Sequence, residues 1–190
     1  MDLRHLFFKY RSYTPIGFIV LLLICADPTW TNYISGLAIL TLGEGIRFWG
    51  VAYAGSATRT TGGAGGDCLV TDGPYRYVRN PLYVGNFLIS LGFLIMCWVW
   101  MPWMIILLII LFGLQYSLIV HLEEEYLSKH FGKQYQEYQK YVGRWIPRLR
   151  PYQKLGRSDP KFIHALKSER NTLQAIVSVC GLLFIRWYFL

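Results

Sequence analysis

Charged residues are scarce in this chain of 190 residues: they make up 16% of it, whereas 54% of the residues are hydrophobic and 17% are aromatic. Ordinary soluble domains carry about 25% charged residues. The low charge and the long apolar runs exclude an ordinary soluble domain and predict an integral membrane protein. The net charge of +8 comes from basic residues flanking the apolar runs. It therefore indicates orientation in the bilayer and contact with anionic headgroups, and no nucleic-acid partner is expected.

Motifs for metals and nucleotides are also missing. The four cysteines show no C-x-x-C spacing and no histidine cluster accompanies them, so we expect neither disulfides nor a metal site. The glycine-rich run at 61–66 lacks the G-K-[ST] of a P-loop, and no predicted strand precedes it, which also disfavours a Rossmann fold. Residues 55–71 are interpreted as a linker or, alternatively, as a mobile lid.

Five apolar runs predict an all-α fold, a polytopic membrane helix bundle that forms one domain over residues 1–190. Runs of this length reach across a hydrocarbon core of about 30 Å. The last one would also suit an interfacial helix. The expected spans are 13–30, 33–54, 82–100, 102–121 and 173–190.

Basic residues set the expected orientation. They are concentrated in residues 1–12, in the loop at 55–81 and in the segment 121–174, which the positive-inside rule places in the cytoplasm with the N-terminus. The first apolar run resembles a signal peptide, but the residues after Ala26 offer no small-x-small cleavage site, so we expect it to remain as a span. We interpret residues 148–172 as a basic, turn-rich surface segment.

The second span contains two ionisable residues, Glu44 and Arg47. Their spacing of three residues predicts an ion pair on one helix face. Alternatively, Arg47 extends toward the interface, or one of the two faces a substrate cavity, because ionisable groups at membrane depth are often functional.

The third span begins with a clear helix start. Asn80 is a preferred N-cap residue, and Pro81 suits the first helical position, where its missing N–H has no intrahelical partner. The free backbone N–H groups of such a helix start, next to Arg79, can hold an anionic group of a cofactor.

The third and fourth spans follow one another with a break only at Met101-Pro102, which predicts a tight helical hairpin. Its arms measure roughly 27 Å and 32 Å, so both ends reach the same face of the bilayer. Tyr83 and Glu123 should therefore lie at similar depth on the cytoplasmic side. Further on, tyrosines at 135, 138 and 141 predict a helix whose aromatic face packs against the bundle or the headgroup layer.

Three polar segments are expected to meet at one cytoplasmic mouth: residues 67–83, the glutamates at 123–125, and Arg144. Together they offer carboxylates for an ammonium group, a helix N-terminus for a carboxylate and aromatic faces for a cation. S-adenosylmethionine carries groups of all these kinds. A simpler interpretation of the three glutamates is that they solvate the end of the fourth span.

Two motifs, separated by the hairpin, carry a resemblance to a known family. The first combines Leu69-Val70 and Gly73-Pro74-Tyr75 with Arg79-Asn80-Pro81-Leu82-Tyr83-Val84-Gly85; the second combines Glu123-Glu124 with Leu127, Phe131-Gly132, Tyr135, Tyr138, Val142, Arg144 and Pro147. On these residues, within 67–147, the chain resembles the isoprenylcysteine carboxyl methyltransferase and phospholipid methyltransferase superfamily. These are small multi-span enzymes that use S-adenosylmethionine.

The resemblance implies a site for S-adenosylmethionine and a lipidic or amphipathic acceptor with a carboxylate, amine or thiol group. Arg79 and Arg144 would line the site and orient an anionic group, and Tyr83, with His121 and Glu124, is a candidate for removing a proton from the acceptor. The residues implied to contact the cofactor are Leu69, Val70, Tyr75, Asn80, Pro81, Leu82, Tyr83, Glu123 and Glu124.

The chain departs from the family pattern at two positions. Asn80 stands where the family commonly has histidine, and Ile119 stands where the eukaryotic prenylcysteine enzymes carry an arginine. The second departure argues against a prenylcysteine carboxylate as acceptor. Two other readings stay open: a membrane accessory protein that has lost catalysis, and a related reductase that uses a nicotinamide cofactor. The sequence does not indicate an oligomeric state.

Overall fold

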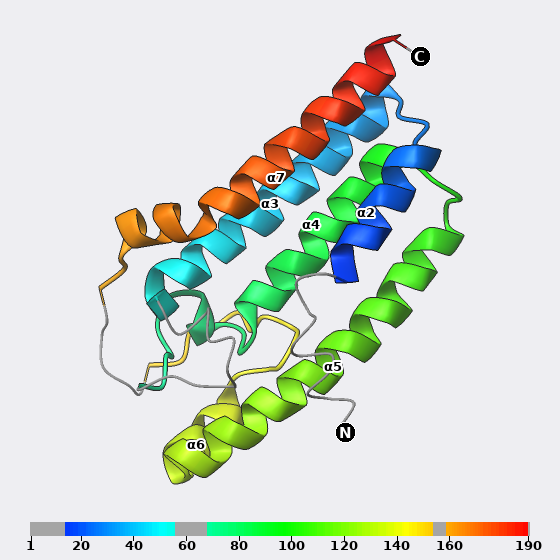
Figure 1. Cartoon of the computed structure of the whole chain (residues 1–190). Coiled ribbons are helices and arrows are strands. Elements are labelled where there is room, and N and C mark those ends of the chain that lie inside the picture. The colour runs from blue at the N-terminus through cyan, green and yellow to red at the C-terminus, as the bar shows by residue number, and fades with distance from the viewer. Residues whose placement is uncertain (1–13, 56–67, 154–158, 190) are drawn as a thin grey trace.

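The computed structural model describes residues 14–55, 68–153 and 159–189, and within these ranges the chain is helical, with no β-strand. The expectations for residues 1–12 and for the glycine-rich run at 61–66 lie outside the described residues. The elements are α2 (Thr14–Cys25), α3 (Trp30–Ala54), the 3₁₀ turn η2 (Gly73–Arg76), α4 (Pro81–Cys97), α5 (Trp103–Phe131), α6 (Lys133–Tyr141) and α7 (Phe162–Phe189). In Figure 1, α7 lies along α3, α4 lies on the other side of α3, and α6 folds back at the end of α5.

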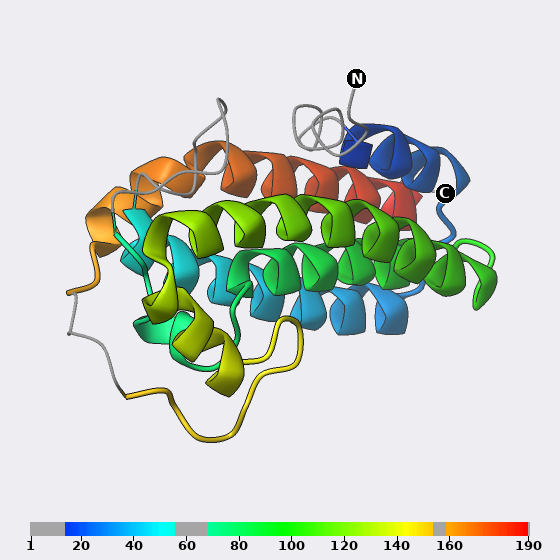
Figure 2. The ribbon, with the colours of Figure 1, turned by 90° about the horizontal axis from the view of Figure 1, so that it is seen from below.

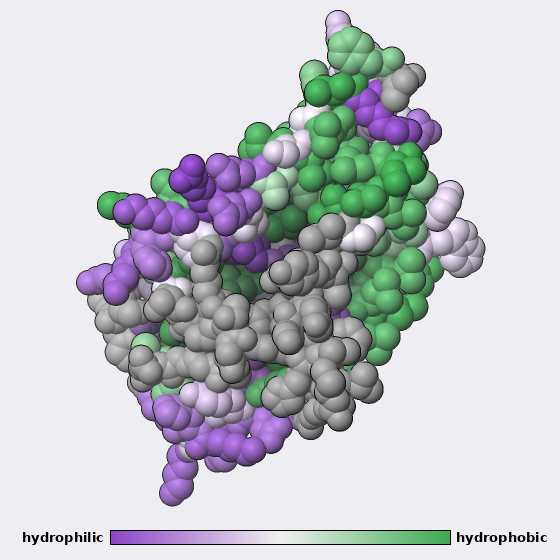
Figure 3. Space-filling model, in the orientation of Figure 1, coloured by the Kyte–Doolittle hydropathy of each residue, from purple (hydrophilic) through white to green (hydrophobic). Residues whose placement is uncertain are grey.

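The composition's prediction of a membrane helix bundle is confirmed. Among the described helices, α3, α5 and α7 are each long and apolar enough to cross a membrane. The face in Figure 3 is hydrophobic toward the C-terminal end of α7 and along much of α5, and hydrophilic around α6 and the start of α7. The number of five spans remains a prediction, because α4 has 17 residues and α2 only 12.

Two helices extend further than the apolar runs indicated. The span expected over 102–121 is part of a longer helix, α5, which continues to Phe131, where Gly132 ends it with a φ of 51°. The last helix begins at Phe162, so the stretch 148–172, predicted to be a turn-rich surface segment, is helical over its second half. Both differences have the same cause: hydropathy marks the lipid-facing part of a helix, whereas backbone hydrogen bonding continues into water.

Small residues bring α3 and α4 into close contact. Gly36 faces Gly92 and Gly43 faces Gly85, so closely that a Cβ atom added to any of the four would lie under 3 Å from backbone atoms of the opposite helix. Glycine at a helix interface lets two backbones approach where larger side chains would separate them. This contact sets the position of α4 against α3. It therefore also sets where the start of α4 lies at the polar end of the bundle.

The apolar core lies toward the other end of the bundle. Leu22, Leu94, Met96 and Leu183, from α2, α4 and α7, are almost fully buried there. The guanidinium of Arg186 donates hydrogen bonds to the carbonyl of Ala26 (2.7 Å) and that of Leu23 (3.4 Å), partners for the open carbonyls at the end of α2.

Candidate functional site

The start of α4 forms one wall of the candidate site. The helix begins at Pro81, as predicted, with Asn80 at the N-cap position. The prediction that the Asn80 side chain caps the helix is wrong, because it makes no hydrogen bond to the first turn. Its Nδ2 donates instead to the backbone carbonyl of Arg144 at 3.1 Å. The asparagine therefore joins the helix start to a segment 64 residues away.

Backbone pairing fastens the segment before α4 to the segment after α6. Val78 forms an isolated parallel bridge with Gly143, and the Arg79 N–H donates to the Gly143 carbonyl at 2.9 Å. The N–H of Arg148 donates to the Tyr77 carbonyl at 2.9 Å. Figure 2 shows this yellow segment running beneath the start of α4. The pairing holds the guanidinium groups of Arg79 and Arg144 at the same mouth.

Tyr83 and Glu123 are in direct contact. The Tyr83 hydroxyl donates to Glu123 Oε1 at 2.6 Å, which confirms that the two ends of the hairpin reach the same level. The Tyr83 ring also packs on Tyr116, with ring centroids 4.8 Å apart. A carboxylate that accepts a short O–H bond in a partly buried site is held in one orientation.

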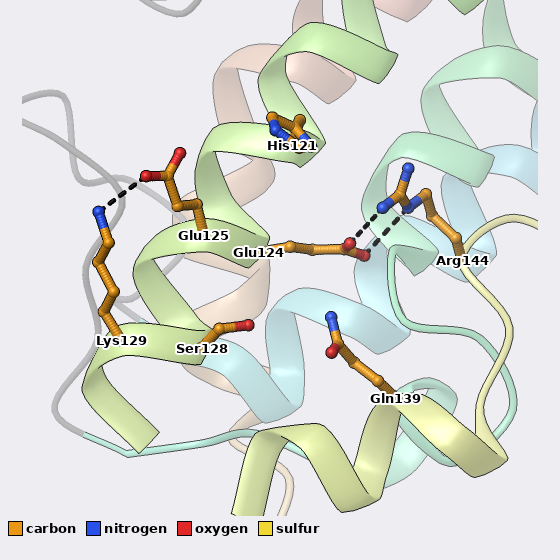
Figure 4. Close-up of a pocket in the computed structure, with 7 residues that line it drawn as sticks. All are labelled: His121, Glu124, Glu125, Ser128, Lys129, Gln139 and Arg144. Carbon is orange, nitrogen blue, oxygen red and sulfur yellow. Dashed lines mark hydrogen bonds and ion pairs between the residues drawn. The ribbon is translucent and has the colours of Figure 1, made fainter. Parts of the chain in front are cut away.

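Glu124 lies between two arginines. Its carboxylate pairs with the Arg144 guanidinium, with one N–H···O contact of 3.2 Å and a second, shorter one, and Arg79 Nη2 lies 3.4 Å from Oε1. Figure 4 shows Glu124 pointing at Arg144, whereas Glu125 points away and pairs with Lys129. The buried Nε of Arg79 has no hydrogen-bond partner among the described residues. The trio Arg79–Glu124–Arg144 thus keeps one net positive charge and one donor that can serve an anion.

Aromatic residues support the wall opposite α5. The Tyr138 hydroxyl donates to the Tyr75 carbonyl at 2.7 Å, and Tyr138 packs with Tyr135, Val142 and Leu69. Tyr135 and Tyr138 are buried, so two of the three tyrosines of the predicted aromatic face pack inward, whereas Tyr141 is half exposed. Burial raises the pKa of Tyr75 above its ordinary value, and the charge of Glu123 raises it further. The Tyr75 hydroxyl therefore stays protonated near neutral pH and can act as a donor.

A pocket of about 430 Å³ opens beside the ion pair of Glu124 and Arg144. Its volume lies in the range of about 300–1,000 Å³ found for small-molecule sites. Besides Glu124 and Arg144, the pocket is lined by His121, Glu125, Ser128 and Lys129 of α5 and Gln139 of α6, all labelled in Figure 4. Of the predicted site residues, Glu124 and Arg144 line this pocket, and Tyr83 and Glu123 do not.

The remaining predicted residues are packed against neighbouring elements or partly buried, and none of them lines the pocket. Leu82 packs against α3, where a Cβ atom on Gly50 would lie 2.8 Å from its Cδ2. Pro81 is buried, and Val70 is half-buried beside η2. Ile119, at the position of the family arginine, is fully buried against Tyr116 and Trp145. Its side chain therefore adds no charge to the mouth.

A buried ion cluster adds a helix that the motifs did not include. The predicted pair of Arg47 and Glu44 is present at 3.5 Å, but the closer carboxylate is that of Glu169 from α7, at 2.7 Å from Arg47 Nη2. Sequence reasoning missed Glu169 because Lys167 and Arg170 flank it and made the stretch look solvated. Its burial follows only once α7 is known to start at Phe162.

The fold and the site together define a membrane helix bundle with a pocket lined by charged side chains at the end opposite the hairpin turn, where Tyr83 contacts Glu123. Residues 31–134 match the sequence profile described as phospholipid methyltransferase, which covers more than half of the chain. The chain belongs to this family.

Curated relatives extend the comparison. The chain is 33% identical over 116 residues to the protein-S-isoprenylcysteine O-methyltransferase of Schizosaccharomyces pombe, covering 60% of this chain and 48% of that protein. It is 32% identical over 126 residues to the enzyme of the same name from Tribolium castaneum, covering 65% and 44%. It is also 27% identical over 171 residues to the nickel-cobalt-cadmium resistance protein NccN of Alcaligenes xylosoxydans xylosoxydans, covering 85% and 73%.

The chain thus spans about half the length of the isoprenylcysteine methyltransferases that it matches. No solved structure matches it. Among the described residues, no group of three or more His, Cys, Asp and Glu side chains is arranged to hold a metal ion.

Proposed function

We propose that this protein is a membrane methyltransferase that uses S-adenosylmethionine and acts on a lipidic or amphipathic acceptor at the membrane interface. The observation that carries the proposal is the hydrogen bond of 2.6 Å between Tyr83 and Glu123, which joins the two family motifs at one level of the bundle. The proposal includes the cytoplasmic orientation of the site, with the bundle crossing the bilayer up to five times.

The residues at the mouth fit the cofactor's charges. Glu123 is the acceptor for its amino group, and the unpartnered Nε of Arg79 is a donor for its carboxylate. The Tyr75 carbonyl and the protonated Tyr75 hydroxyl offer polar contacts on the opposite wall. Asn80 acts indirectly, because its amide fixes the Arg144 backbone. Leu69, Val70, Pro81 and Leu82 belong to the same proposed set and shape the wall around these groups.

When bound, the cofactor supplies a sulfonium methyl group whose leaving group is already activated. The chain then has to align donor and acceptor and exclude water, tasks that can provide most of the rate. Arg79 and Arg144 orient an anionic group of the acceptor or the cofactor, because Glu124 neutralises only one of their two charges. For an acceptor that must lose a proton, His121 on the pocket lining is one candidate to receive it; Tyr83 can do so only by passing its own hydroxyl proton to Glu123, to which it donates.

The acceptor is proposed as lipidic or amphipathic because the site lies where apolar helices emerge into a polar layer. The two isoprenylcysteine enzymes named above act on a lipidated cysteine by their names, and this chain differs from their eukaryotic pattern at Ile119. We therefore leave carboxylate, amine and thiol acceptors as alternatives. Labelled S-adenosylmethionine added to membranes that contain the protein will identify the acceptor by the compound that becomes labelled.

Binding measurements on the purified full chain in detergent test the cofactor. We expect Glu123→Ala to raise the Kd for S-adenosylmethionine roughly 10- to 100-fold, since a hydrogen bond to a charged group contributes about 1.5–3 kcal/mol. Glu125→Ala is the matched control: it removes an exposed carboxylate paired with Lys129, and we expect less than about a twofold change.

The same assay separates the alternatives. A protein that binds a reduced nicotinamide cofactor and does not bind S-adenosylmethionine would be a reductase. A protein that binds neither cofactor would be an accessory protein, and the proposed methyltransferase function would fail. Equal, small effects of the two glutamate variants would mean that the triplet only solvates the end of the apolar part of α5.

A further inference from the structure

Arg47 lies inside the bundle next to two carboxylates, those of Glu44 and Glu169, whereas its guanidinium carries a single positive charge. Its guanidinium contacts Glu169 Oε2 of α7 at 2.7 Å and lies 3.5 Å from Glu44 Oε2 on its own helix. Both Glu44 oxygens are buried without a hydrogen-bond partner among the described residues, so of these two carboxylates only that of Glu169 accepts a hydrogen bond from Arg47. The α7 carboxylate therefore decides which way the guanidinium is held.

A third contact of Arg47 leads to α4. Its Nη1 donates to Oδ1 of Asn86, and Nδ2 of the same amide donates to the Tyr116 hydroxyl at 3.3 Å. An asparagine side chain has one acceptor end and one donor end. Because the arginine can only donate, it fixes the acceptor end toward itself and turns the donor end toward Tyr116.

The chain of contacts continues to the proposed cofactor site. Tyr116 packs on Tyr83 with ring centroids 4.8 Å apart, and the Tyr83 hydroxyl donates to Glu123 at 2.6 Å. Burial raises the pKa of Tyr75, the charge of Glu123 raises it further and that of Arg47 opposes the rise, which agrees with an ion cluster close to the site.

We propose that Glu169 is a positioning residue for the Tyr83–Glu123 pair and acts through Arg47, Asn86 and Tyr116. The inference rests on the proposed function, because the pair is taken to hold the cofactor. Glu169 lies outside residues 31–134, which match the family, and outside both motifs. In this chain a helix beyond the family core thus sets the geometry of the core's cofactor contact. Without Glu169, the nearest carboxylate for Arg47 is Glu44, and a turn toward it removes the donor that orients Asn86.

The test is a double-mutant cycle read as the Kd for S-adenosylmethionine in the purified full chain. Glu169→Gln keeps the size of the side chain and removes its charge; Tyr116→Phe keeps the ring and removes the hydroxyl that accepts from Asn86. We expect each change alone to raise Kd roughly three- to tenfold, and the second to add little once the first is present, because contacting residues in one network are not additive. Ser168→Ala is the control, a buried change at the neighbouring position of α7, and should leave Kd unchanged.

Kd separates positioning from general damage. Partial misfolding lowers the number of binding sites and leaves the Kd of the folded fraction unchanged. Equal Kd values for the wild type and both variants would overturn the inference, as would fully additive effects or an equal loss in Ser168→Ala. If Glu169→Gln does not fold, Asn86→Leu replaces it in the cycle with the same expectation. No binding by the wild type would overturn the proposed function itself, and with it the inference.

Discussion

Replacing Gly43 by alanine should destabilise the helix bundle, because Gly43 lies at the close contact between α3 and α4 that positions α4. A Cβ atom at position 43 would lie 2.8 Å from the Gly85 carbonyl oxygen, 2.8 Å from Leu88 Cβ and 2.9 Å from the Ile89 nitrogen. Two of these three are backbone atoms and the third is a Cβ atom, so no rotation of a flexible side chain can relieve the contact. The two helices must move apart instead.

Gly45→Ala isolates this steric effect. Nothing lies within 4 Å of a Cβ atom at position 45, on the same helix. Both changes gain the same helix preference of alanine over glycine, about 0.5–1 kcal/mol. The difference between the two variants therefore measures the overpacking alone, for which about 1–3 kcal/mol is typical.

Thermal unfolding of the purified full chain in detergent provides the measurement. At roughly 2–4 °C per kcal/mol for a chain of this size, Gly43→Ala should melt about 2–12 °C below Gly45→Ala. Gly45→Ala itself should melt at or slightly above the wild type. Equal melting temperatures for the two variants would refute the close approach of α3 and α4 as described.

Two further predictions concern the polar end and the far end of the bundle. Burial raises the pKa of Tyr138, so the folded state holds this proton more tightly than the unfolded chain, and stability is retained below about pH 10 and lost as the pH rises further. We expect Tyr138→Phe to reduce this alkaline loss while lowering stability at neutral pH by about 0.5–1.5 kcal/mol, through the missing bond to the Tyr75 carbonyl; an unchanged alkaline melting curve would contradict it. Arg186→Met should leave the carbonyls of Ala26 and Leu23 without donors and speed amide hydrogen exchange in α2 selectively. Unchanged exchange there would show that α2 is held by its apolar contacts alone.

Local rules predicted the parts of the site that depend on one helix or one hairpin. The start of α4 at Pro81 follows from proline's fixed φ and missing N–H, and the level of Tyr83 relative to Glu123 follows from helix rise and a short turn. The side chain of Asn80 did not follow its local preference, because the Arg144 carbonyl, brought close by the pairing of Val78 with Gly143, competes for the amide. Such competition depends on tertiary structure and has no local signal.

The ion-pair partners of the charged residues also could not be predicted from their spacing in the sequence. The spacing of Glu44 and Arg47 correctly indicates a pair, but the stronger contact is made across 122 residues to Glu169. Similarly, Glu124 and Arg144 were both expected near the site, and nothing in their spacing indicated that Glu124 would serve Arg79 as well. Which carboxylate an arginine selects is decided by the packing of helices, and hydropathy placed the start of the last helix too late to include Glu169.

The family core does not complete its own site in this chain. Residues 31–134 supply Tyr83, Glu123, Glu124 and Arg79, but the second and closer arginine on Glu124 is Arg144, and the closer carboxylate on Arg47 comes from α7. Both lie after the matched region, and each approaches from a different side: Arg144 from the loop after α6, Glu169 through the interior of the bundle. Arg144 contacts Glu124 at the outer side of the candidate site, and Glu169 contacts Arg47 on its inner side. Under the proposed function, we therefore expect changes in these two segments to alter cofactor binding or acceptor choice while residues 31–134 stay the same.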